Sequence, residues 1–166
     1  MKSLLQSFKY AFNGIGFAIY NERNMRIHVC VAVYIVLFSL FYHLSKTEYI
    51  LLFLTIGMMF FAELVNTAIE YVVDLQSRKY NVYAKVAKDV SAGAVLVCAF
   101  VSVIVGFVLF FDVPTIKMIF NFLTHNIVFL IIFAISIFVA YYFIFKFGRK
   151  RIIRGEKWVQ KVHSFQ

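Results

Sequence analysis

Long apolar stretches separated by short polar ones form the main pattern of this sequence. A helix needs about 20 mostly apolar residues to cross the hydrocarbon core of a membrane. Four stretches are long enough or nearly so, and the first is the shortest; they run over about residues 27–44, 49–73, 92–111 and 127–145. This pattern predicts an all-α integral membrane protein with four spanning helices.

Residues 3–20 follow a different pattern. Apolar side chains recur there at helical spacing, for example at Leu5, Phe8, Phe12 and Ile15, while polar side chains fall between them. This periodicity is typical of an amphipathic helix that lies in the membrane interface. Such a helix either serves only as an anchor or also lines a site at the membrane surface.

The composition excludes several classes of protein. Hydrophobic residues make up 63% of the 166 residues and charged residues only 15%, whereas soluble domains carry about a quarter charged residues. A net charge of +9 is compatible with nucleic-acid binding, but the basic residues occupy the gaps between apolar stretches and form no separate basic face. Cys30 and Cys98 lie inside apolar stretches, so neither a disulfide framework nor a zinc site is predicted.

The basic residues also predict the orientation in the membrane. Fifteen of the seventeen lie before the first apolar stretch, between the second and third, or after the fourth. Only Lys46 and Lys117 lie in the two opposite loops. Because positively charged loops stay in the cytoplasm, both termini and the 74–90 loop are expected there.

The second apolar stretch carries a polar stripe. Its second half, FFAELVNTAIEYVVD, contains Glu63, Asn66, Glu70 and Asp74, whose spacings of three and four residues place them on one face of a helix. A carboxylate inside the membrane costs at least about 2.5 kcal/mol without a partner and therefore marks a candidate functional site. The structural alternatives are an interhelical ion pair for Glu63, a solvated helix end for Glu70, and a hydrogen bond between helices for Asn66.

Further polar residues are expected at the same depth. Glu22 precedes the first span and Asp89 precedes the third, so both should meet the cytoplasmic end of the second span. Together with Arg23 and Lys88 they suit a metal-bound polyphosphate, since Mg²⁺ prefers oxygen ligands and is commonly held by one or two carboxylates plus phosphates. A carboxylate held away from water can take a proton from an alcohol, and phosphoryl transfer otherwise requires positioning and charge neutralisation.

Three short motifs make the pattern specific. They are Asn21-Glu22-Arg23-Asn24, the run ELVNTAIE at 63–70 followed by Asp74, and the run AKDVSAGAV at 87–95. Their order and separation resemble the small prokaryotic diacylglycerol kinase family, which includes undecaprenol kinases, over about residues 2–111. The resemblance implies homotrimers with three spanning helices and a surface helix per subunit. It also implies transfer of the γ-phosphate of MgATP to a membrane lipid alcohol.

The resemblance further implies individual roles. Glu63 corresponds to the general base that acts on the lipid hydroxyl, and Glu22 with Glu70 corresponds to the magnesium-binding pair. The matched residues that complete the catalytic and nucleotide sites are Tyr10, Asn66, Asp74, Lys88 and Asp89.

The resemblance also bears on the lipid substrate, and it ends before the C-terminal third of the chain. Glu22-Arg23-Asn24 followed by His28 resembles the branch that favours undecaprenol, with diacylglycerol as the alternative. Residues 112–166 depart from the family and are predicted to form an extra loop, the fourth span and a basic tail that binds anionic lipid or serves as an anchor. The extra helix raises the question of whether the family trimer forms. No P-S-G-H signature follows, so a phosphatase activity, as in kinase–phosphatase fusions, is not expected.

Two other functional classes compete with a kinase. Small proton-coupled transporters also combine four spans with an intramembrane Glu, but they carry it in the first span, where this chain has no acid. A non-catalytic assembly subunit would leave the polar stripe without a function. The sequence therefore predicts an ATP-dependent lipid kinase that uses Mg²⁺ and has its active site at the cytoplasmic face of the cell membrane.

Overall fold

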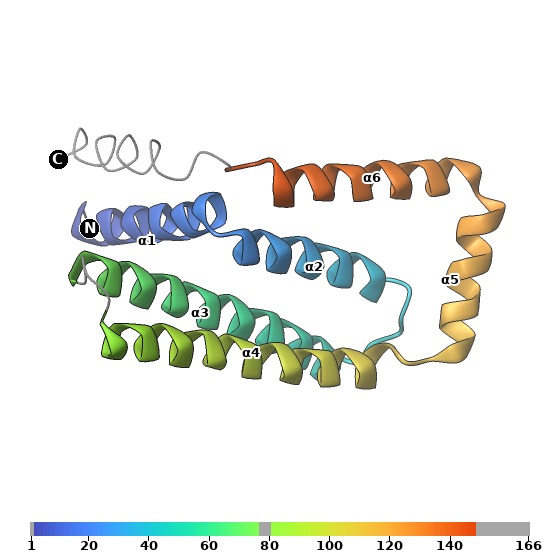
Figure 1. Cartoon of the computed structure of the whole chain (residues 1–166). Helices are drawn as coiled ribbons and strands as arrows, with labels where there is room; N and C mark the ends of the chain where they lie inside the picture. Colours follow the sequence, from blue (N-terminus) through green and yellow to red (C-terminus); the bar gives the residue numbers. More distant parts are fainter. Residues whose placement is uncertain (1, 77–80, 149–166) are drawn as a thin grey trace.

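The computed structural model describes residues 2–76 and 81–148, which contain helices and no strands. The helices are α1 (Lys2–Asn21), α2 (Arg23–Ser39), α3 (Lys46–Gln76), α4 (Val82–Phe110), α5 (Val113–His125) and α6 (Ile127–Phe145). Figure 1 shows α6, α2, α3 and α4 side by side in that order, with α5 running across one end of the group. The all-α membrane fold predicted from the sequence is confirmed.

Helix α1 matches the amphipathic segment expected at residues 3–20. It ends at Asn21 because Glu22 adopts an extended conformation, with φ −100° and ψ 122°, before α2 begins. Ala18 is buried, but the large apolar side chains at Leu5, Phe8 and Phe12 are exposed. An apolar helix face that no other described residue covers is suited to contact with lipid.

The hairpin of α3 and α4 forms the longest helix pair in the structure (Figure 1). Helix α4 begins at Val82, ten residues before the predicted span, because Asn81 accepts hydrogen bonds from the backbone nitrogens of Tyr83 and Ala84 and so caps the helix. The prediction of a loop at residues 74–90 is therefore wrong for most of these residues, which belong to α3 or α4. Lys88 and Asp89 lie on a helix and not in a loop.

Three helices, α3, α4 and α6, are long and apolar enough to cross a membrane among the residues described. Helix α2 has 17 residues, which gives a length of about 26 Å against a hydrocarbon core of about 30 Å. It ends at Ser39, five residues before the predicted end, and tight turns follow in which the amides of Leu40, Phe41 and Tyr42 bond to carbonyls three residues back. A crossing by α2 stays a prediction.

Helix α5 corrects the expectation of a loop between the last two spans. The carboxylate of Asp112 accepts a hydrogen bond of 3.0 Å from the backbone nitrogen of Thr115 and caps α5. Pro114, which lies in the first turn, has a backbone angle suited to a helix start. Hydrogen bonds from the side chain and backbone of Thr115 lower the pKa of Asp112. The apolar-length criterion missed this helix because it is short and lies between two longer apolar stretches.

Helix α6 has the same bounds as the predicted fourth span, and it packs along α2. The Tyr34 hydroxyl donates a 3.0 Å hydrogen bond to Ser136 Oγ, and the ring of Phe133 lies edge-on to that of Tyr34. A cavity of about 890 Å³ with apolar walls remains between α2, α5 and α6. The predicted basic tail from Arg149 onward, and the loop residues Arg78 and Lys79, lie outside the described residues.

The cap of α5 predicts a pH-dependent helix start. Because the folded-state pKa of Asp112 lies below that of the unfolded chain, its contribution to stability is present at neutral pH and is lost as the pH falls through the folded-state value. At low pH, we expect the backbone amide of Thr115 to exchange hydrogen faster in the wild-type protein than in Asp112→Asn. The side-chain amide oxygen of that variant can cap the helix without titrating. Equal pH dependence in the two proteins, measured by hydrogen exchange, would contradict the assignment.

Candidate active site

The candidate site lies where α3 ends and α4 begins, beside the C-terminal end of α1. The ring of Phe17 on α1 packs edge-on against Tyr71 on α3, with ring centroids 5.1 Å apart. Helix α2 also contacts α3. Helices α1, α2 and α4 therefore all contact α3, the helix that carries the polar stripe predicted from the sequence.

The polar stripe of α3 passes from the interior to the solvent. Glu63 is 2% exposed and Asn66 is buried, whereas Glu70 is half-buried and Asp74 is exposed. Their spacing places them on one face of α3. Thr67, which the sequence reasoning did not consider, is buried on the same face, and its hydroxyl donates to the backbone carbonyl of Glu63 at 2.9 Å.

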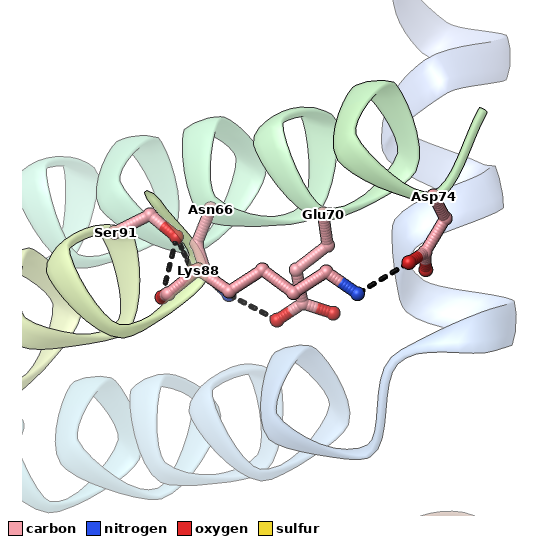
Figure 2. Close-up of polar contacts among 5 residues, drawn as sticks. All are labelled: Asn66, Glu70, Asp74, Lys88 and Ser91. Carbon is pink, nitrogen blue, oxygen red and sulfur yellow. Dashed lines mark hydrogen bonds and ion pairs between the residues drawn. The ribbon is translucent and has the colours of Figure 1, made fainter. Parts of the chain in front are cut away.

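A chain of hydrogen bonds connects α4 with α3 (Figure 2). Ser91 Oγ donates to Asn66 Oδ1 at 2.7 Å, and Asn66 Nδ2 donates to Glu70 Oε1 at 2.9 Å. The first bond fixes which way the Asn66 amide faces, and the second holds the Glu70 carboxylate. Asn66 therefore holds the Glu70 carboxylate and also joins the two helices, so the interhelical hydrogen bond considered as its structural alternative is present.

Lys88 and Asp74 form an ion pair between α4 and the last turns of α3. The Lys88 side chain is 36% exposed and that of Asp74 is 65% exposed. A pair this exposed contributes little to stability. Its main effect is to direct the Lys88 ammonium group along α3 towards the solvent end of the stripe, as Figure 2 shows.

The carboxylate of Glu63 is the least compensated polar group of the site. Its Oε2 atom is buried and accepts no hydrogen bond from residues 2–76 or 81–148. Glu63 forms no ion pair with another described residue, so the interhelical ion pair considered as its structural alternative is not found. Instead, burial disfavours a charge on Glu63, and the carboxylates of Glu22 and Glu70 disfavour it further. A buried carboxylate with two like charges nearby is unfavourable in folding terms, and such groups concentrate at functional sites.

The structure gathers most of the predicted site residues but leaves two outside the cluster. Tyr10 is 47% exposed, and its phenol oxygen accepts a hydrogen bond from Gln6. Asp89 is exposed and forms no hydrogen bond or ion pair with another described residue. Ser91 was not singled out from the sequence, although it lies in the motif AKDVSAGAV, three residues after Lys88 and therefore on the same face of α4.

The donor atoms present suit a hard cation only in part. No group of three or more His, Cys, Asp or Glu side chains is arranged to hold a metal ion in the described part of the chain. Glu22, at the α1–α2 junction, and Glu70, on α3, supply carboxylate oxygens, and both carboxylates disfavour a charge on Glu63. Two carboxylates completed by phosphate oxygens are the usual way in which proteins bind Mg²⁺, and a divalent cation would relieve this repulsion. The residues therefore fit Mg²⁺ bound together with a phosphate ligand.

Comparison with known proteins identifies relatives of this chain. The family model described as prokaryotic diacylglycerol kinase matches residues 9–110. Undecaprenol kinase from Bacillus subtilis is 41% identical over 110 residues, covering 66% of this chain and 89% of that protein. A diacylglycerol kinase from Synechocystis is 43% identical over 105 residues, which cover 63% of this chain and 60% of that protein. A diacylglycerol kinase from Haemophilus influenzae is 29% identical over 109 residues, which cover 65% of this chain and 92% of that protein. Helices α5 and α6 lie beyond the residues that the family model matches.

The uncompensated carboxylate predicts that Glu63→Gln stabilises the protein. The neutral amide removes the repulsion from Glu22 and Glu70 and keeps the side-chain volume. Removing such an unfavourable functional group typically adds about 1 kcal/mol, which raises Tm by roughly 2–4 °C in a protein of this size. Thermal unfolding in detergent micelles measures the change. Asp89→Asn, which neutralises an exposed acid, is the matched control and should leave Tm unchanged; a lower Tm for Glu63→Gln would contradict the prediction.

Proposed function

This chain belongs to the prokaryotic diacylglycerol kinase family and is therefore a lipid kinase, and we propose that it transfers the γ-phosphate of ATP to the hydroxyl group of undecaprenol. The observation that carries the proposal is Glu63, a buried carboxylate with a free oxygen on an apolar helix. Its place on a helix long and apolar enough to cross a membrane supports a lipid hydroxyl, rather than a soluble alcohol, as the acceptor.

Glu63 acts as the general base. Its Oε2 atom is not engaged by another described residue, so it can accept the proton of the lipid hydroxyl. The hydroxyl oxygen then forms a bond to the γ-phosphorus as the bond from that phosphorus to the β-phosphate oxygen breaks. ADP leaves with the electron pair, and the proton remains on Glu63 until it passes to water.

Glu22 and Glu70 would hold Mg²⁺ together with the phosphates of ATP. When bound, the cation neutralises phosphate charge, which is the main requirement of phosphoryl transfer. Asn66 keeps the Glu70 carboxylate in place through the 2.9 Å hydrogen bond. Because the Lys88–Asp74 pair is partly exposed, Lys88 can exchange Asp74 for a phosphate oxygen, and Asp74 remains beside the nucleotide.

Tyr10 and Asp89 contact the nucleotide in the proposed site. Both side chains are exposed, which supports contact with a nucleotide that arrives from the cytosol. The excess of basic residues before α2 and between α3 and α4 supports a cytoplasmic location for this end of the bundle. We place the protein in the cell membrane, as homotrimers of the kind that the family resemblance implies.

The choice of lipid has two supported candidates. The motif at 22–24 followed by His28 and the 41% identity to an undecaprenol kinase favour undecaprenol. The 43% identity to a diacylglycerol kinase favours diacylglycerol as the second candidate. A proton-coupled transporter is not supported by any comparison, and the clustering of the acids at one end of the helices favours chemistry at the membrane surface.

Loss of the general base predicts loss of transfer. With ATP, Mg²⁺ and undecaprenol in detergent micelles, we expect Glu63→Gln to lower kcat by about 10²–10⁴, the range for removal of a general base. The matched control is Glu48→Gln, a change at the opposite end of the same helix, which should keep wild-type kcat. Radiolabelled phosphate incorporated into lipid gives the rate. Glu63→Gln with full activity would remove Glu63 from the mechanism.

Substrate preference is tested in the same micelles with the wild-type protein. We expect kcat/KM for undecaprenol to exceed that for diacylglycerol at equal mole fraction in the micelle. The reverse order would keep the mechanism and change the lipid. Transfer to neither lipid by folded protein would contradict the kinase proposal.

A further inference from the structure

The guanidinium group of Arg26 connects three helices. Arg26 lies in the first turn of α2 and is 5% exposed. Its Nη1 atom donates to the carbonyl oxygens of Tyr20 at 2.8 Å and Ile19 at 3.1 Å, in the last turn of α1, and its Nε atom donates to that of Ile144 at 3.2 Å, in the last turn of α6. Carbonyls at helix ends lack helical partners and carry partial negative charge, so they are suitable acceptors for a buried cation.

Two further contacts bring the end of α6 to the same point. The rings of Tyr20 and Phe147 meet edge-on, with centroids 5.4 Å apart. Gly148 has a positive φ of 84°, and a Cβ atom there would lie 2.2 Å from the carbonyl oxygen of Tyr20. Only glycine allows both this conformation and this approach. We call Arg26, Tyr20, Ile144, Phe147 and Gly148 the junction contact.

The junction contact surrounds the residue that links α1 to α2. Glu22 is the extended residue between the two helices, and its amide bonds to the carbonyl of Ala18. The amide of Arg26 bonds in turn to the carbonyl of Glu22. The position of the Glu22 carboxylate, whose charge acts on Glu63, therefore depends on the backbone that Arg26 holds.

Among the described residues, helix α6 has its main contacts with α2 and α5. It packs on α2, and Figure 1 shows it on the side of α2 away from α3. It also lies beyond the residues matched by the family model. A segment added to the kinase part of the chain thus contacts the backbone next to one of the acids of the site.

We propose that Arg26 is a positioning residue that, by joining the end of α6 to the α1–α2 junction, holds Glu22 in place for metal binding. This inference rests on the proposed function, because Glu22 is there a magnesium ligand. It assigns to the added helix a role in the reaction, exerted through the backbone and without contact to the substrates.

The test uses Gly148→Ala in the full-length protein. The added methyl group cannot lie 2.2 Å from the Tyr20 oxygen, so the end of α6 must move away. We expect faster hydrogen exchange over residues 18–26 and an increase of about tenfold in the Mg²⁺ concentration for half-maximal activity, the lower range for loss of a partner that supports a metal ligand. The matched control is Gly106→Ala on α4, where a Cβ atom meets nothing within 4 Å; it should change neither quantity.

A second, milder variant keeps the test valid if Gly148→Ala does not fold. Phe147→Leu removes only the ring contact with Tyr20 and should shift both quantities in the same direction by a smaller factor. If hydrogen exchange at the junction is faster but the Mg²⁺ requirement is unchanged, the positioning role of Arg26 is contradicted. If hydrogen exchange in Gly148→Ala is unchanged, the contact between the end of α6 and the α1–α2 junction is contradicted. Absence of transfer by the wild type would overturn the proposed function instead, and the exchange data alone would then decide whether α6 restrains the junction.

Discussion

A carboxylate held inside a bundle of apolar helices is the constraint on which the rest of this structure depends. Glu63 is 2% exposed, and one of its oxygens has no hydrogen-bond partner within the described ranges. Such a group opposes folding, so the neighbouring helices must hold it. The long packing of α3 on α4 and the hydrogen bonds from Ser91 through Asn66 to Glu70 supply that support. These contacts offset part of the cost of keeping a buried carboxylate in a fixed position.

The order of the helices separates two tasks. Helices α3 and α4 carry the polar stripe and its supporting hydrogen bonds, whereas α6 has a mostly apolar surface and, within the described residues, is joined to the α1–α2 junction through Arg26. Glu22, at that junction, belongs to both parts, because its charge acts on Glu63 and its backbone is held by Arg26. The arrangement makes the junction the place where the added segment can influence the site.

Much of the fold was predictable because apolar length and helical spacing are direct signals. The bounds of α6 agree with prediction, and the stripe from Glu63 to Asp74 lies on one face as its spacing required. The early start of α4 was missed because a hydrophobicity pattern does not register a helix that continues into polar residues after a cap such as Asn81. The contacts of Arg26 were missed because its acceptors are backbone carbonyls, one of them 118 residues away. No pattern of side chains records such a contact.

The stripe on α3 also has a direction, and this direction bears on how a product leaves. From Glu63 to Asp74 the helix rises by about 16 Å, from a buried position to an exposed one. Under the proposed reaction, an uncharged alcohol reaches the inner end of this gradient at low cost, whereas a phosphorylated lipid carries charge that the same surroundings disfavour. The polarity gradient along one helix face thus admits the substrate and expels the product towards the water.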